Sequence, residues 1–150
     1  MVSTGLAIVF TLSIAALFGA MLFFPAIVAP RVFAALDPDD AGRFLRRLFP
    51  GYYAFLIATS ALAALAAALI GDPALNWPFM ALGLIALSTA WVRQVLTPQL
   101  NRWRDAELAG DSAAAAKFKS GHRLSVIINL VQLVVVFAIL IDLAASGFRA

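Results

Sequence analysis

The sequence predicts an all-α integral membrane protein, in which residues 1–150 form a single domain. The expected architecture is an antiparallel four-transmembrane-helix bundle with short cytoplasmic interfacial helices. Hydrophobic residues make up 63% of the chain and charged residues 13%, whereas soluble domains average roughly 45–50% and 25%. The mean hydropathy is +0.95. The apolar residues fall into four runs, each near the ~20 residues that cross a ~30 Å hydrocarbon layer.

The first membrane span is expected over residues 6–29, ending at Pro30-Arg31, with a kink at Pro25. A signal peptide is the competing interpretation of this segment. The segment has no basic region before it, and its apolar run is longer than the usual 7–15 residues of a signal peptide. We therefore expect a retained helix.

A short interfacial helix is expected after the first span. Asp37-Pro38 has the chemistry of a helix start, and Phe49-Pro50 should end the helix. Arginines from this region should lie at lipid phosphates as surface anchors. These anchors are Arg31, Arg43, Arg46 and Arg47. Recognition of a specific anionic ligand is the alternative role.

The remaining spans are expected over residues 52–70, 77–96 and 124–145. Gly71 should end the second span, because glycine suits the position after a helix and the nearby Pro73 cannot continue one. Small residues recur at packing intervals, as at Ala15 and Gly19 in the first span. Packing inside the bundle explains such pairs, and contact within a homo-oligomer is the alternative.

The connection between the third and fourth spans should form a helical hairpin. The third helix should extend to about Ala109 and break at Gly110, after which Asp111 or Ser112 caps a new helix. Three residues of this connection are predicted to be interfacial anchors rather than a nucleic-acid platform. They are Arg102, Trp103 and Arg104.

The distribution of basic residues predicts the orientation. Residues 31–51 carry four and residues 93–123 carry six, which together are ten of the eleven Lys and Arg residues; Arg149 is the other. The positive-inside rule makes the 31–51 and 97–123 connections cytoplasmic and places both termini outside. A bacterial inner membrane is the expected location. The pI near 10.0 therefore indicates contact with lipid headgroups, and no nucleic-acid partner is expected.

A row of polar residues marks the fourth span as the candidate functional element. Their spacing places them within roughly 80° of one helical face. The row consists of His122, Ser125, Asn129 and Gln132. Amides in hydrocarbon are costly without a partner, so the row should face protein, water or a ligand. Interhelical hydrogen bonding is the structural alternative.

Arg93 and Gln94 lie near the cytoplasmic end of the third span and are further candidates. Arg93 could extend to the lipid headgroups, or it could bind a partner such as Asn129 or a bound anion. The sequence shows no cysteine and one histidine, and it has no phosphate-binding loop or hydrolase motif. We therefore expect no enzyme activity, no cofactor and no metal site.

Two motifs resemble the transmembrane protein 205-like family, whose bacterial members carry a domain of unknown function numbered 4149. The first motif consists of Leu48, Phe49, Pro50 and Tyr52. The second consists of Phe118, His122, Leu124, Ser125, Asn129 and Leu130. Pro98, which closes the segment Leu-Thr-Pro, adds to the similarity. The resemblance implies a four-span membrane protein.

Two function classes follow, and a cofactor-bound oxidoreductase subunit is a third. The family resemblance implies tolerance or export of metal complexes, because one member is linked to tolerance of a platinum drug. The first class is a small-solute transporter that is oligomeric and whose path is lined by the polar row. The second class is a non-catalytic membrane module that binds a lipid, a cofactor or a partner subunit at the cytoplasmic mouth near His122.

Overall fold

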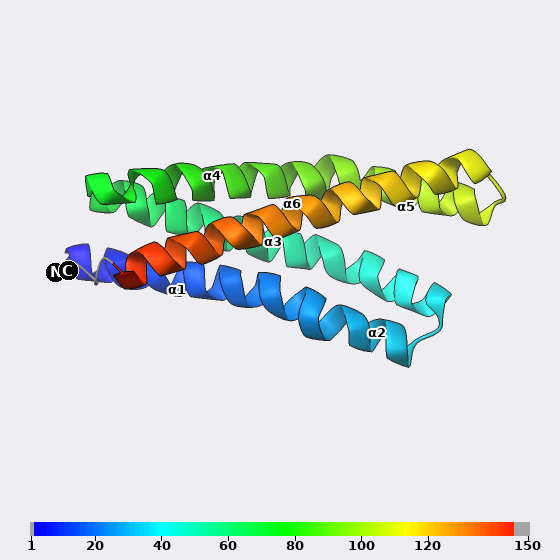
Figure 1. Ribbon diagram of the computed structural model, residues 1–150, viewed down its shortest axis with the longest axis horizontal. Coiled ribbons are helices and arrows are strands. Elements are labelled where there is room, and N and C mark those ends of the chain that lie inside the picture. Colours follow the sequence, from blue (N-terminus) through cyan, green and yellow to red (C-terminus); the bar gives the residue numbers. More distant parts are fainter. Residues whose placement is uncertain (1, 146–150) are drawn as a thin grey trace.

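The protein is all-helical in the part of the chain that the computed structural model describes, residues 2–145. Four of its helical segments are long and apolar enough to cross a membrane. These segments are Thr4–Ala35, Pro38–Ile70, Pro73–Leu108 and Ser112–Ala145. Figure 1 shows that each segment runs back alongside the preceding one. The prediction of four helices long and apolar enough to cross a membrane is therefore confirmed, whereas Arg149 lies outside the described residues.

The first span contains α1 (Val2–Phe23), a π-helical turn η1 (Phe24–Val28) and α2 (Ala29–Ala35). The helix continues beyond Pro30-Arg31, where the membrane span was predicted to end, as far as Ala35. A proline ring collides with the carbonyl four residues earlier in a regular α-helix. Here the wider turn comes first, and the Ala29 N–H donates to the Phe24 carbonyl, five residues back. The helix passes Pro30 without ending.

The second span is one 33-residue helix, α3 (Pro38–Ile70). The separate interfacial helix that was predicted to end at Phe49-Pro50 is therefore absent, and Pro50 lies inside α3. A proline removes one backbone hydrogen bond. The segment before it stays helical because it is packed: Ala41 and Leu45 are buried. At its other end α3 stops at Gly71, whose φ of +71° is the left-handed conformation predicted there.

The third span repeats the design of the first. A short 3-10 turn, η2 (Pro73–Leu75), precedes α4 (Asn76–Trp91), and then come the π-helical turn η3 (Val92–Leu96) and α5 (Thr97–Leu108). The Thr97 N–H donates to the Val92 carbonyl, again five residues back and one residue before a proline, Pro98. In both spans, a π-helical turn directly before a proline thus allows the helix to continue through the proline.

The α5–α6 hairpin is confirmed as predicted. Gly110 adopts a φ of +98° between the helices. The Asp111 carboxylate accepts hydrogen bonds from the backbone N–H groups of Ala113 (2.9 Å) and Ala114 (3.1 Å) and so caps α6 (Ser112–Ala145). The α2–α3 and α5–α6 connections lie at one end of the bundle (Figure 1). We call this the basic end, because residues 31–51 and 97–123 lie towards it.

Each span is longer than a membrane is thick. A helix of 33 residues measures about 50 Å at 1.5 Å per residue, whereas the hydrocarbon layer is ~30 Å. The charged residues of these spans gather towards the basic end, so each span is long enough to extend beyond a hydrocarbon layer at that end. The residues predicted to form an interfacial helix belong to the charged part of α3.

The core lies between α1, α3 and α4, with α3 packed along both neighbours. Its fully buried large side chains include Phe10, Ile14, Leu17, Met21, Leu56, Leu82, Val136 and Ile139. The last two come from α6, which is the least buried span. Ala15 and Gly19 lie on the exposed face of α1, so the interpretation of this pair as core packing is wrong.

Candidate functional site

The polar row divides by depth, and Gln132 is its most buried member. Its side chain is 7% exposed. The Nε2 atom donates to Ser88 Oγ at 2.8 Å and to Thr89 Oγ1 at 3.2 Å, both on α4. These bonds join two helices that otherwise touch little along their length. The structural interpretation of the row therefore accounts for Gln132.

The outer half of the row faces away from this contact. Ser125 donates from Oγ to the His122 carbonyl of its own helix at 2.7 Å, a local bond that occurs in many helices. His122 is exposed, and its ring stacks on Phe118 with the centroids 6.0 Å apart. The Arg104 guanidinium lies 5.5 Å from the centre of the Phe118 ring. This end of α6 thus presents an aromatic pair beside a cation.

Asn129 lies between these two halves, and its Oδ1 atom is the unusual one. This atom is buried and has no hydrogen-bond partner among the described residues. It lines a small cavity of about 20 Å³ between α3, α4 and α6. The lining residues are Tyr53, Leu56, Thr89, Val92, Ser125, Ile128, Asn129 and Gln132. Three of the four residues of the predicted row, Ser125, Asn129 and Gln132, therefore line one small recess.

Arg93 binds α3 rather than the polar row. Its Nε donates to the Pro50 carbonyl at 3.2 Å, so the predicted partner Asn129 is wrong, and the bound-anion alternative gains no support from this contact. The η3 turn carries Arg93 to this position. Gln94 in the same turn is exposed and does not line the recess.

Aromatic rings surround the segment that carries the first motif. Phe24, in the η1 turn, packs against Tyr52 (centroids 4.7 Å apart) and Phe49 (5.4 Å apart). Phe49 also stacks on Tyr53, at 5.5 Å. Leu48 beside them is half-buried. Contacts of this kind stabilise helix packing, so the motif residues Phe49 and Tyr52 hold the first π-helical turn against α3.

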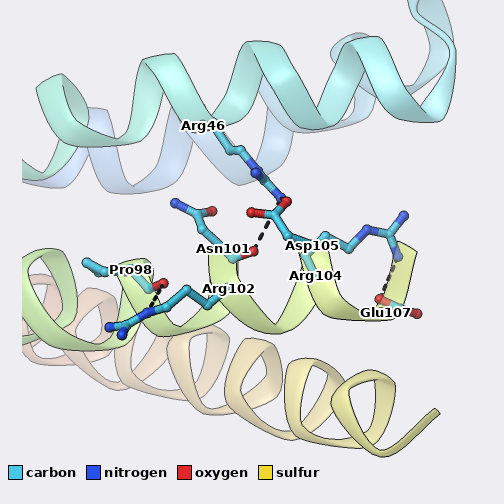
Figure 2. Close-up of polar contacts among 7 residues, drawn as sticks. All are labelled: Arg46, Pro98, Asn101, Arg102, Arg104, Asp105 and Glu107. Carbon is cyan, nitrogen blue, oxygen red and sulfur yellow. Dashed lines mark hydrogen bonds and ion pairs between the residues drawn. The ribbon is translucent and has the colours of Figure 1, made fainter. Parts of the chain in front are cut away.

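Four of the arginines predicted as anchors bind protein groups, and Figure 2 shows three of them. Arg46 reaches from α3 to α5, where its Nη2 lies 2.6 Å from Asp105 Oδ1 and 3.5 Å from the Asn101 carbonyl. Arg104 pairs with Glu107 at 2.8 Å. Two further anchors are also engaged locally: Arg102 with the Pro98 carbonyl at 3.4 Å, and Arg43 with Asp40.

Trp103, predicted to be a lipid anchor, instead packs against α6. A Cβ atom added to Gly121 would lie 2.8 Å from Trp103 Cζ3 and 2.9 Å from Leu100 Cδ2. Gly121 is buried and lets the two helices of the hairpin approach closely. Sequence reasoning missed this role. The available signal was a glycine within an otherwise good helix, since such a residue often has a packing reason.

The Arg46–Asp105 pair is expected to contribute little to stability. Its side chains are 35% and 61% exposed, and exposed ion pairs typically contribute about 0.2–1 kcal/mol. A double-mutant cycle with Arg46→Gln and Asp105→Asn, followed by unfolding in detergent, should give a coupling energy below about 1 kcal/mol that falls with salt. A larger, salt-independent coupling would contradict this view.

Several cations at the basic end have no ion-pair partner within residues 4–145. These exposed side chains are Arg31, Arg47, Lys117, Lys119 and Arg123. The same part of the chain contains no group of three or more His, Cys, Asp or Glu residues placed to hold a metal ion. The available charge chemistry is therefore binding of anions.

The comparison with known proteins gives one match. Residues 12–108 match the family described as Domain of unknown function (DUF4149). No curated protein and no solved structure matches the chain. The matched region includes the aromatic motif and both π-helical turns, and it ends before α6 with the His122 motif. Because the match covers more than half of the sequence, the chain belongs to the DUF4149 family.

Proposed function

We propose that this protein is a non-catalytic membrane module that binds anionic lipid headgroups at the start of α6. The proposal rests on two cations beside His122, Lys119 and Arg123. Both side chains are exposed, and neither has an ion-pair partner among the described residues. At 100° per residue these three side chains lie within about 100° of one helical face. They directly precede the apolar run that begins at Leu124.

This position suits a lipid phosphate. Basic residues next to a membrane helix attract anionic headgroups, each contributing about 1 kcal/mol. Arg46 and Arg104 at the basic end are held by protein partners. Lys119 and Arg123 remain available to a ligand. The positive-inside rule supports placing this end on the cytoplasmic side, in a bacterial inner membrane.

The size of the recess argues against a solute path through one chain. The cavity below His122 has a volume of about 20 Å³, enough for one water molecule. Further along α6, Gln132 donates hydrogen bonds to Ser88 and Thr89 of the neighbouring helix α4. The polar row therefore supports helix packing and binding at its mouth better than it supports permeation.

The test measures retained lipid by native mass spectrometry. The full-length protein is purified from bilayers of phosphatidylglycerol and phosphatidylcholine, as wild type and as Arg123→Gln. We expect the variant to retain about five-fold less phosphatidylglycerol, which corresponds to the loss of about 1 kcal/mol. Retention of phosphatidylcholine should not change.

Lys117→Gln is the matched control. It removes the same charge from an exposed position of α6, about 160° from Lys119 around the helix. Equal loss of phosphatidylglycerol in the control would show a general charge effect and would contradict a defined site. Solute flux in proteoliposomes that Gln132→Leu abolishes in a folded protein would favour transport instead.

A further inference from the structure

We infer that the recess below His122 binds one structural water molecule that bridges Asn129 on α6 to Thr89 on α4. The inference is independent of the proposed lipid site. The recess is lined by residues of α3, α4, η3 and α6. Its volume of about 20 Å³ exceeds the ~10–15 Å³ that one water molecule requires.

Asn129 provides the strongest reason for a bound water. Its Oδ1 atom is buried without a hydrogen-bond partner in the described part of the chain. An unmade hydrogen bond of this kind costs about 1–3 kcal/mol, and the apolar surroundings of a membrane bundle offer no relief. A water in the recess donates a hydrogen bond to Oδ1 and removes this cost.

Thr89 provides the second contact. Its Oγ1 accepts a hydrogen bond from Gln132 Nε2. The hydroxyl group of Thr89 can therefore donate its own hydrogen bond to another acceptor. The oxygen of the water is that acceptor. Gln132 also lines the recess, and its side-chain carbonyl is a third polar group that can accept a hydrogen bond from the water. Two to four polar partners are what a buried water needs.

The chemistry of the lining favours water over a cation. The side chains around the recess are neutral, and no carboxylate is among them. A hard cation in a protein takes about six oxygen ligands, usually with carboxylates to balance its charge. The recess lacks both the charge and the space for such a shell. Water satisfies the same polar atoms without introducing a charge.

The experiment is water-edited solid-state NMR of the full-length protein in lipid bilayers. It measures magnetisation transfer from water to the side chains of Thr89 and Asn129. Wild-type protein should show strong transfer to both. In Asn129→Leu, a side chain of similar size without the acceptor, transfer to Thr89 should fall several-fold. Thr89→Val should likewise reduce transfer to Asn129, which gives a second route if one variant does not fold.

Ser125→Ala is the matched control. Ser125 also lines the recess, but its hydroxyl proton is already donated to the His122 carbonyl. Transfer to Thr89 should therefore stay at the wild-type level. Wild-type protein without transfer to Asn129 would overturn the inference. A change in the Asn129 signals when choline replaces sodium would also overturn it, because a cation would then be the ligand.

Discussion

Gly121→Leu should destabilise the protein by about 1–3 kcal/mol, the usual cost of overpacking a well-packed contact. The first atom of the new side chain would lie 2.8 Å from Trp103 and 2.9 Å from Leu100. Neither distance is tolerated without movement. Leucine is a better helix former than glycine by about 1 kcal/mol, so a loss of stability cannot come from helix propensity. It must come from the α5–α6 contact.

Gly83→Leu is the control for this prediction. Gly83 lies within α4, and a Cβ atom added there meets nothing within 4 Å. This variant should be neutral or slightly more stable in the same unfolding titration in detergent. Trp103→Ala should reduce the cost of Gly121→Leu, because it removes the ring in the way. If both glycine variants behave alike, the close approach at Gly121 does not stabilise the hairpin.

Local chemistry was sufficient to predict the spans and several of their ends. Four apolar runs predicted four spans, because a run of about 20 apolar residues is the length that a helix needs to cross the hydrocarbon layer. Gly71 and Gly110 adopt the left-handed conformation at the predicted stops. Asp111 caps the next helix through its own side chain. Each of these features depends on one or two neighbouring residues, which a sequence displays directly.

The prolines could not be interpreted in this way. Pro30 and Pro50 indicate helix ends by their local preference, yet both lie inside helices. A π-helical turn accommodates the first, and packing before the second keeps α3 continuous. Both reasons depend on how neighbouring helices and the turn itself are built. Helical periodicity alone does not contain that information.

For the candidate site, the sequence predicted the face but not the partners. Helical spacing correctly placed Asn129 and Gln132 towards the protein. It could not indicate that Ser88 and Thr89 accept hydrogen bonds from Gln132, because they lie 44 and 43 residues away in the chain. Arg93 likewise binds the Pro50 carbonyl, a backbone atom that residue types do not reveal. In each case, the sequence does not indicate which residues of different helices lie next to each other in the folded protein.

Gln132→Leu should lower the free energy of unfolding by about 1–2 kcal/mol. The substitution removes two hydrogen bonds to α4, and such bonds contribute about 0.6–1.7 kcal/mol each in membrane proteins. The effect should be large for this chain, because α6 is its least buried span. Leucine preserves the volume, so a cavity does not contribute. The measurement is unfolding of the purified protein in a detergent titration.

A double-mutant cycle identifies the source of that loss. Combined with Thr89→Val, Gln132→Leu should cost less than the two single variants together, by up to about 1 kcal/mol, since one of the broken bonds is shared. The control pairs Gln132→Leu with Thr59→Val, because Thr59 bonds only the carbonyls of its own helix. That pair should be additive. If both pairs are additive, Gln132 does not bind Thr89, and its link to α4 rests on Ser88 alone. If only the Thr89 pair is coupled, Gln132 joins α6 to the bundle, and the mouth near His122 remains the place for a ligand.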